Sequence, residues 1–265
     1  MDTLFGPDSA VWRLHGDFSG LVGGLRALAV QSLEPRALAG VQQFSQFQHS
    51  PDRRLRETIA FVDTISYGDL EEVRTAIAAV RRLHEPVEGV DPTTGDSFAA
   101  NDPYLLAWVH NAMVESVCFA YRSFHPEAGI APCDQYVYEM SRFAELMGCD
   151  MDEVPLEYGE VSHWIWRQPK LVVNEATRDA IDVLDRLHPE GFVGQAYPLV
   201  MRWLYASLPD WVTVQLDRQV GMPQETLAWL ALKLGGELSN MVAQPSPSRV
   251  RAEARYAQVG ADATH

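Results

Sequence analysis

The sequence predicts an all-α protein, and three observations support this fold class. Apolar residues recur three and four positions apart through most of the chain, which is the spacing of one helix face. Alternating strands and helices, hairpin dipeptides and runs with a period of two do not stand out. Proline stands in the first turn of several expected helices, where it is well tolerated. The 265 residues carry no internal repeat and no clear linker, so we expect a single helical domain over residues 1–265.

The first third of the chain predicts a series of helices after a turn at residues 6–9. They cover residues 21–30, 35–47, 52–65 and 70–84. The third of them is expected to bury Leu55, Ile59 and Val62. In the fourth, the apolar stripe follows the spacing i, i+4, i+7, i+11 and ends on a histidine: Val73, Ile77, Val80 and His84.

A loop rich in Gly, Pro, Thr and Asp is expected over residues 85–101, and a long fifth helix follows it. Asn101 or Asp102 caps this helix, Pro103 lies in its first turn, and it runs to about Phe124. Its predicted core face consists of Leu106, Val109, Met113, Val117 and Phe124, with His110 beside this face.

The remaining chain predicts further helices over residues 133–147, 174–187, 196–207 and 223–234. The tail over residues 244–265 is expected to be either a terminal helix or a mobile segment.

Composition excludes several classes of function. The net charge is −15 and the chain has only two lysines, so nucleic acid and anionic membrane surfaces are not expected as partners. No apolar run is long enough to span a bilayer and the N-terminus lacks the features of a secretion signal, so we expect a cytoplasmic protein. Three widely spaced cysteines argue against a disulfide framework, a zinc site and an iron–sulfur cluster.

Two histidines on apolar helix faces, His84 and His110, are the main candidates for a ligand site. A buried imidazole needs a hydrogen bond or a metal. The plain alternative is that each histidine bridges helices through hydrogen bonds. Haem iron needs one proximal histidine, whereas a non-haem iron site prefers two histidines and a carboxylate.

Arg54 and Thr58 lie four residues apart and therefore on one helix face. Such an arginine could pair with a haem propionate or a substrate oxygen, and the threonine could donate a hydrogen bond to iron-bound dioxygen. Arg53 and Arg56 flank the pair and are alternative propionate partners. An ordinary surface arginine beside a filler threonine is the plain alternative.

Several short motifs, taken in order, resemble one known family. They are GPDSAVWR (residues 6–13), RALAVQ (26–31), RLRET (54–58), YGD (67–69), RRLHEPVEG (81–89) and AANDPYLLAWVH (99–110). Together they resemble the oxygenases that include bacterial rubber oxygenase and the fungal oxygenase of mycophenolic acid biosynthesis. The resemblance covers roughly residues 5–148, and residues 149–265 are expected to form a less predictable helical part.

The resemblance implies a partly globin-like helical fold that binds haem b through one histidine. His84 is the best match to that iron ligand, and His110 is the second choice. Arg54 and Thr58 match the family's distal Arg-xxx-Thr pattern, and Arg54 or Arg56 would contact the haem. Rubber oxygenases also use a carboxylate upstream of the arginine as an acid/base group, and Glu34 lies in that region.

This chain departs from the rubber oxygenases at two points. Glu57 stands where those enzymes carry a lysine that can bind the iron, and their export signal is missing. We therefore expect an intracellular enzyme, either a monomer or a homo-oligomer, that uses dioxygen or peroxide to oxidise an apolar small molecule in secondary metabolism. A haem-binding sensor or carrier without turnover is the alternative.

Overall fold

Several helices of this protein begin where a short polar side chain accepts hydrogen bonds from the first free backbone N–H groups. Ser9, Asp17 and Asp102 each accept such a bond at the start of a helix. Asp69 and Glu72 form a reciprocal capping box, in which each side chain accepts from the backbone N–H of the other. The caps at Asp69 and Asp102 fix the starts of the two helices that carry His84 and His110.

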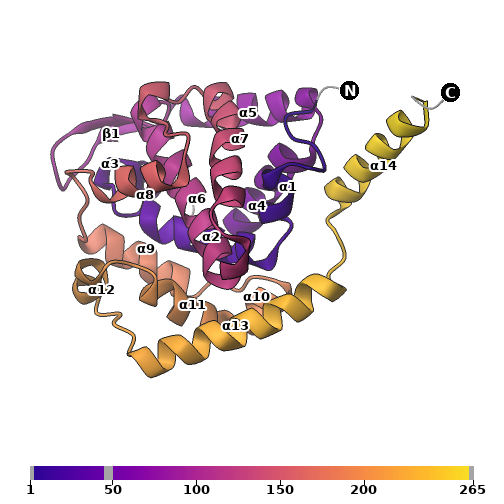
Figure 1. Ribbon diagram of the computed structural model, residues 1–265. Coiled ribbons are helices and arrows are strands. Elements are labelled where there is room, and N and C mark those ends of the chain that lie inside the picture. The colour runs from indigo at the N-terminus through magenta and orange to yellow at the C-terminus, as the bar shows by residue number, and fades with distance from the viewer. Residues whose placement is uncertain (1–2, 45–49, 263–265) are drawn as a thin grey trace.

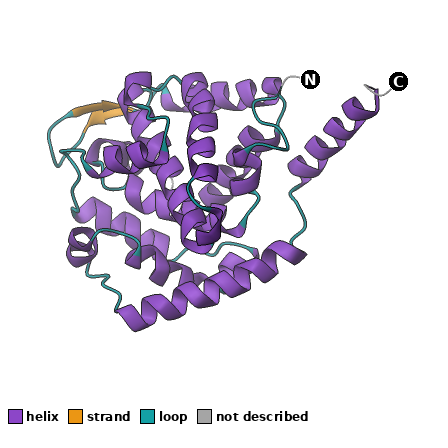
Figure 2. Ribbon diagram, viewed as in Figure 1, coloured by secondary structure: helices purple, strands orange, loops and turns teal. Residues whose placement is uncertain are grey.

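The computed structural model describes residues 3–44 and 50–262, and these residues are mostly helical, which confirms the all-α fold class (Figures 1 and 2). The first seven helices are α1 Ala10–His15, α2 Phe18–Gln31, α3 Pro35–Phe44, α4 Pro51–Tyr67, α5 Leu70–His84, α6 Pro103–Phe124 and α7 Ala131–Met147. The rest are α8 Tyr158–Trp166, α9 Glu175–Asp185, α10 Gly191–Gln195, α11 Tyr197–Ala206, α12 Asp210–Leu216, α13 Met222–Val242 and α14 Pro247–Asp262. Short 3-10 turns cover Pro126–Ala128 and Met151–Glu153. The end of the predicted helix over 35–47 lies outside the described residues.

The segment between α5 and α6 contains a small hairpin where the sequence predicted a plain loop. Strands β1 (Glu88–Val90) and β2 (Ser97–Ala99) pair antiparallel, with Gly89 opposite Phe98. Asp91 accepts hydrogen bonds from the backbone N–H groups of Thr93 and Thr94 and so fixes the connecting turn. Three-residue strands are too short to show a period of two, which explains the wrong prediction.

Helices α2 and α6 form the most extensive helix pair in the described chain. A Cβ atom at Gly23 would lie 2.6 Å from the Cα atom of Val117, so only glycine allows this close approach of the two backbones. Gly24, one position along, faces open space. The packing of α2 on α6 therefore depends on one glycine of the pair.

A buried arginine joins α2 to two other helices. The Arg26 side chain is 1% exposed and forms an ion pair with Glu115 on α6. It also donates to the hydroxyls of Ser116, at 2.7 Å, and of Ser207, at 3.0 Å. Its guanidinium lies 4.3 Å from the ring centroid of Phe119. Because Ser207 caps α11, this single side chain connects the N-terminal helices to the C-terminal part.

The central helix α6 is buried on more sides than one amphipathic stripe predicts. Trp108, Ala112 and Ala120 are fully buried against the α2 side, while Leu106 and Val117 face a second core shared with α7. Val109, expected in the core, is 43% exposed and that expectation was wrong. The two packed faces leave only a narrow solvent face, and Val109 lies on it.

The C-terminal tail forms a helix, α14, that returns to the N-terminal end of the chain. The hydroxyl of Tyr256 lies 2.5 Å from that of Thr3, and Arg255 donates to the carbonyl of Tyr67 at 2.6 Å. Ala252 is fully buried. Across residues 3–44 and 50–262, the apolar stretches of the helices are all too short to cross a bilayer.

Alanine substitutions at the two neighbouring glycines of α2 are expected to have opposite effects. Gly23→Ala should lower the free energy of unfolding by about 1–3 kcal/mol, because the methyl group meets the α6 backbone. Gly24→Ala should leave it unchanged or raise it by up to about 1 kcal/mol, because alanine favours the helix and meets nothing. Urea unfolding of both variants checks this, and equal effects would contradict the close α2–α6 approach.

Candidate functional site

Arg54 and Thr58 lie on α4, four residues apart as predicted, and both are exposed. The Nη1 atom of Arg54 forms an ion pair with Glu57 at 3.3 Å. The Thr58 hydroxyl donates to the Arg54 backbone carbonyl at 2.9 Å. To donate elsewhere, the Thr58 hydroxyl must release this bond, whereas the Arg54 guanidinium has further N–H groups besides the one paired with Glu57.

The N-terminal half of α4 is more open than the sequence predicted. Leu55 and Val62 are half-buried, but Ile59 is 41% exposed, so the expected buried stripe is only partly formed. Full burial begins at Ile65 and Tyr67, near the end of the helix. The face that carries the Arg/Thr pair is therefore accessible to a ligand.

Arg56 also lies on the exposed part of α4. Within the described chain it forms no hydrogen bond or ion pair, so its guanidinium is available to an anionic group. Arg53, in contrast, pairs with Glu57 at 3.9 Å.

His84 is the last residue of α5 and is half-buried, as its place in the apolar stripe predicted. Its buried Nδ1 atom has no hydrogen-bond partner among the described residues. Burial lowers the pKa of His84, hydrogen bonding toward the Asn101 side chain and the Ala100 backbone raises it, and the positive charge of Arg54 lowers it. Asn101 and Ala100 therefore lie close to the imidazole, although neither makes a hydrogen bond of normal geometry with Nδ1. The structure thus places His84 near Arg54 and presents a neutral imidazole at neutral pH.

Asn101 is a site residue that the sequence analysis considered only as a helix cap. Asp102 takes the cap role, and the Asn101 amide donates to the carbonyl of Arg81 at 3.0 Å. Its buried Oδ1 atom, like the Nδ1 of His84, has no partner among the described residues. Asn101 lies in the same AANDPYLL stretch that carried the resemblance, but its spacing from His84 depends on the unpredicted hairpin.

His110 lies inside α6 and is 5% exposed. Its ring centroid is 6.0 Å from that of Phe143 on α7, and its Nδ1 has no hydrogen-bond partner in the described part of the chain. Burial lowers the pKa of His110 to about 4. A neutral, unpartnered imidazole is therefore held in an apolar setting here as well.

His15 shows how this protein satisfies a structural histidine. Both of its ring nitrogens have a hydroxyl partner: Nδ1 lies 2.6 Å from the Ser66 hydroxyl and Nε2 lies 2.7 Å from the Tyr136 hydroxyl. Burial lowers the pKa of His15 to about 4 as well, so a low pKa does not distinguish the histidines. The unpartnered Nδ1 atoms of His84 and His110 do distinguish them.

The two candidate histidines do not form one site with a carboxylate. No hydrogen bond or ring contact joins them within the described residues. Over the same residues, no three His, Cys, Asp or Glu side chains are grouped so that they could hold a metal ion.

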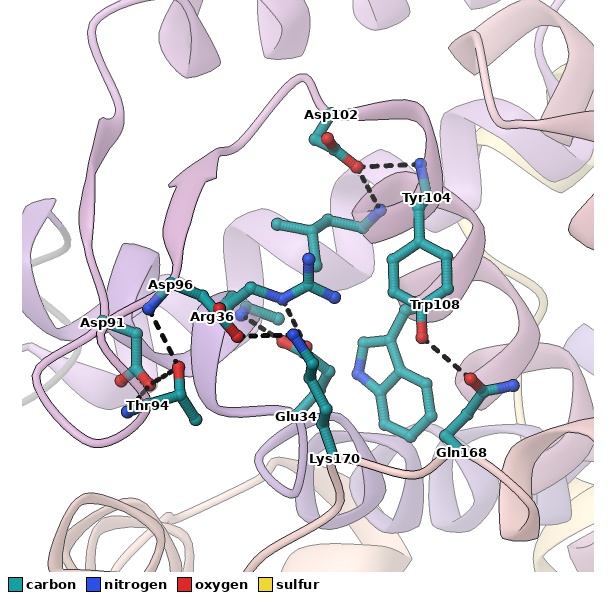
Figure 3. Close-up of polar contacts among 12 residues, drawn as sticks. Glu34, Arg36, Asp91, Thr94, Asp96, Asp102, Tyr104, Trp108, Gln168 and Lys170 are labelled. Carbon is teal, nitrogen blue, oxygen red and sulfur yellow. Dashed lines mark hydrogen bonds and ion pairs between the residues drawn. The ribbon is translucent and has the colours of Figure 1, made fainter.

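Glu34 is fully engaged at the start of α3 (Figure 3). One carboxylate oxygen lies 2.8 Å from Arg36 Nε and the other accepts from the Ala37 backbone N–H at 2.8 Å. The Arg36 guanidinium lies over the ring of Tyr104, whose hydroxyl donates to Gln168 at 2.9 Å. Glu34 is 1% exposed, and in this arrangement it holds α3 against α6.

A family model matches residues 12–237, which is well over half of the chain. Its description is "ER-bound oxygenase mpaB/B'/Rubber oxygenase, catalytic domain". The chain belongs to this family. Neither the curated proteins nor the solved structures give a match.

The family match confirms the resemblance and extends it. The sequence motifs supported similarity to about residue 148, whereas the match continues through α8 to α12 and most of α13. Helices α8 to α12 and most of α13 therefore belong to the family's catalytic domain, whereas α14 lies beyond the match, and the enzyme is of the oxygenase type.

The low pKa of His110 predicts a pH-dependent stability. The unfolded chain takes up a proton near pH 6.5 and the folded chain only near pH 4, so stability falls as the pH drops from 6.5 towards 4. When the pH is lowered from 7 to 5, the free energy of unfolding of His110→Leu should fall by about 2 kcal/mol less than that of the wild type. Urea unfolding at both pH values measures this difference. The same change at exposed His163 should have no such effect. An unaltered pH dependence in His110→Leu would contradict the burial of a neutral imidazole.

Proposed function

We propose that this protein is a haem-b-dependent oxygenase that oxidises an apolar small molecule with dioxygen or peroxide. One observation carries the proposal: a half-buried imidazole with an unpartnered Nδ1, at His84, lies near an arginine on an open helix face. Membership of an oxygenase family supports this reading of the two residues.

The residues around His84 fit haem in three respects. A neutral imidazole has a free lone pair for iron, and one such ligand is sufficient for haem. Arg54 and Arg56 supply guanidinium groups that can pair with propionates. The exposed half of α4 also carries Ile59, whose side chain is 41% exposed and can contact the edge of a macrocycle. We assign His84 as the iron ligand, with His110 as the second choice.

Bound haem supplies oxygen activation, and the protein's own residues determine where it takes place. His84 stays unprotonated through the neutral range because burial and Arg54 disfavour its charged form. The Arg54 guanidinium provides positive charge next to this position, and Glu57 partly neutralises it. The Thr58 hydroxyl can donate a hydrogen bond to another acceptor once its bond to the Arg54 carbonyl opens.

A haem-binding sensor or carrier is the second candidate. Its support is the present state of the distal pair: Arg54 is bound to Glu57 and the Thr58 hydroxyl to its own helix. Groups occupied in this way do not assist oxygen chemistry. Full haem loading without oxidation of any apolar substrate, with either dioxygen or peroxide, would favour this candidate over the oxygenase.

The experiment is haem reconstitution of the wild type and of His84→Ala, followed by absorption spectroscopy and pyridine haemochrome analysis. We expect a Soret band with one haem b per chain in the wild type, and a loss of at least tenfold in haem affinity in His84→Ala. The control is His163→Ala, which removes an exposed histidine from α8 and should bind haem normally.

A comparison with His110→Ala makes the assignment specific. If His110→Ala loses the haem and His84→Ala keeps it with an unchanged spectrum, the ligand is His110. If the reconstituted wild type shows no porphyrin absorbance, the haem proposal is wrong and the two histidines have another role.

A further inference from the structure

Helix α13 has two apolar faces, and among the described residues only one of them is buried against other helices. Ala228, Leu232 and Gly236, spaced four residues apart, are buried. A Cβ atom at Gly236 would lie 2.4 Å from the Phe18 ring, so this face sits tightly on α2. Figure 1 shows α13 running along one edge of the molecule.

The opposite face of α13 carries a stripe of large apolar side chains that are exposed by 45% to 72%. The members of this leucine stripe are Leu227, Leu230, Leu234, Leu238 and Met241. At 100° per residue they fall within about 80° of the helix circumference, and they extend over roughly 21 Å. A continuous exposed apolar surface of this kind marks an interaction site.

The leucine stripe is symmetric about its middle residue. Leu230 and Leu238 lie four residues before and after Leu234, and Leu227 and Met241 lie seven before and after it. A twofold axis through Leu234 would therefore place Leu234 against its own copy, Leu230 against Leu238, and Leu227 against Met241. Self-complementarity of one patch is the requirement of an isologous dimer.

Charges on α13 permit this antiparallel pairing. In the same register, Glu237 faces Ala231 of the other copy and Glu225 faces Ala243, so no carboxylate opposes another. Lys233 is already paired with Glu127 at 3.6 Å and lies over the Trp229 ring. A lipid surface is a poorer fit, because interfacial helices carry several basic residues and α13 has only this one lysine.

We propose that α13 is a dimerisation helix, which pairs antiparallel with α13 of a second copy of this chain about a twofold axis at Leu234. The pairing covers the leucine stripe and leaves α4, α5 and the candidate haem site free. It does not depend on the proposed function.

Sedimentation velocity over a concentration series tests the dimer. The wild type should show a monomer–dimer equilibrium, and Leu234→Glu should raise the dissociation constant at least tenfold, because it sets two carboxylates against each other on the axis. The control is Leu83→Glu, which changes an exposed leucine on α5 and should leave the equilibrium unaltered. Circular dichroism verifies that both variants are folded.

Cross-linking tests the register. The three natural cysteines are buried, so a short bismaleimide should join only introduced ones. Leu234→Cys should cross-link to itself. Leu230→Cys should cross-link more efficiently to a tagged Leu238→Cys chain than to another Leu230→Cys chain, since positions 230 and 238 lie about 12 Å apart along one helix.

Three results would overturn the proposal. They are a wild type that remains monomeric up to the highest concentration, a Leu234→Glu variant that dimerises like the wild type, and preferential Leu230–Leu230 cross-linking, which indicates a parallel pair. Binding of the monomer to neutral lipid vesicles, lost in Leu234→Glu, would assign the leucine stripe to a membrane surface instead.

Discussion

The buried guanidinium of Arg26 holds the positions of helices that come from distant parts of the chain. Removing an arginine and a glutamate from water costs several kcal/mol per ion unless their hydrogen bonds are satisfied inside the protein. Here Glu115, Ser116 and Ser207 accept those bonds, and they come from α6 and the end of α11. Together with the glycine contact at Gly23, this network fixes α6 against α2. The placement of His110 and the start of α6 beside His84 both follow from it.

Buried polar atoms without partners are the second constraint. They also occur at Trp12 and Ser19, so the two histidines are singled out by their metal-binding chemistry together with this geometry. A buried nitrogen without a partner costs about 1–3 kcal/mol, and His15 shows that this fold can satisfy a buried imidazole when only packing is required. The Nδ1 atom of His110 keeps that cost, and the Nδ1 atom of His84, which lies close to Asn101 and Ala100, keeps part of it. Buried polar atoms without hydrogen-bond partners are expected at functional sites, where a bound ligand supplies the missing interaction.

Local signals in the sequence predicted the helices that carry the site. Asp69 marked the start of α5, Asn101 or Asp102 marked that of α6, and the spacing of Val73 and Ile77 placed His84 on the packed face. The hairpin before α6 was missed because its strands are three residues long. Contacts between distant residues could not be read from spacing, and they include the Arg26–Glu115 pair and the proximity of Arg54 to His84. The exposure of Ile59 depends on which elements cover α4, and a single amphipathic pattern does not contain that information.

The central claim is that His84 is the ligand of a haem iron, and chemical rescue tests it most directly. The His84→Gly variant would be reconstituted with haem and its absorption spectrum recorded with and without added imidazole. The account predicts a weak or shifted Soret band that imidazole restores to the wild-type position, while His110→Gly keeps the wild-type spectrum without imidazole. A His84→Gly spectrum that equals the wild type and does not respond to imidazole would contradict the claim.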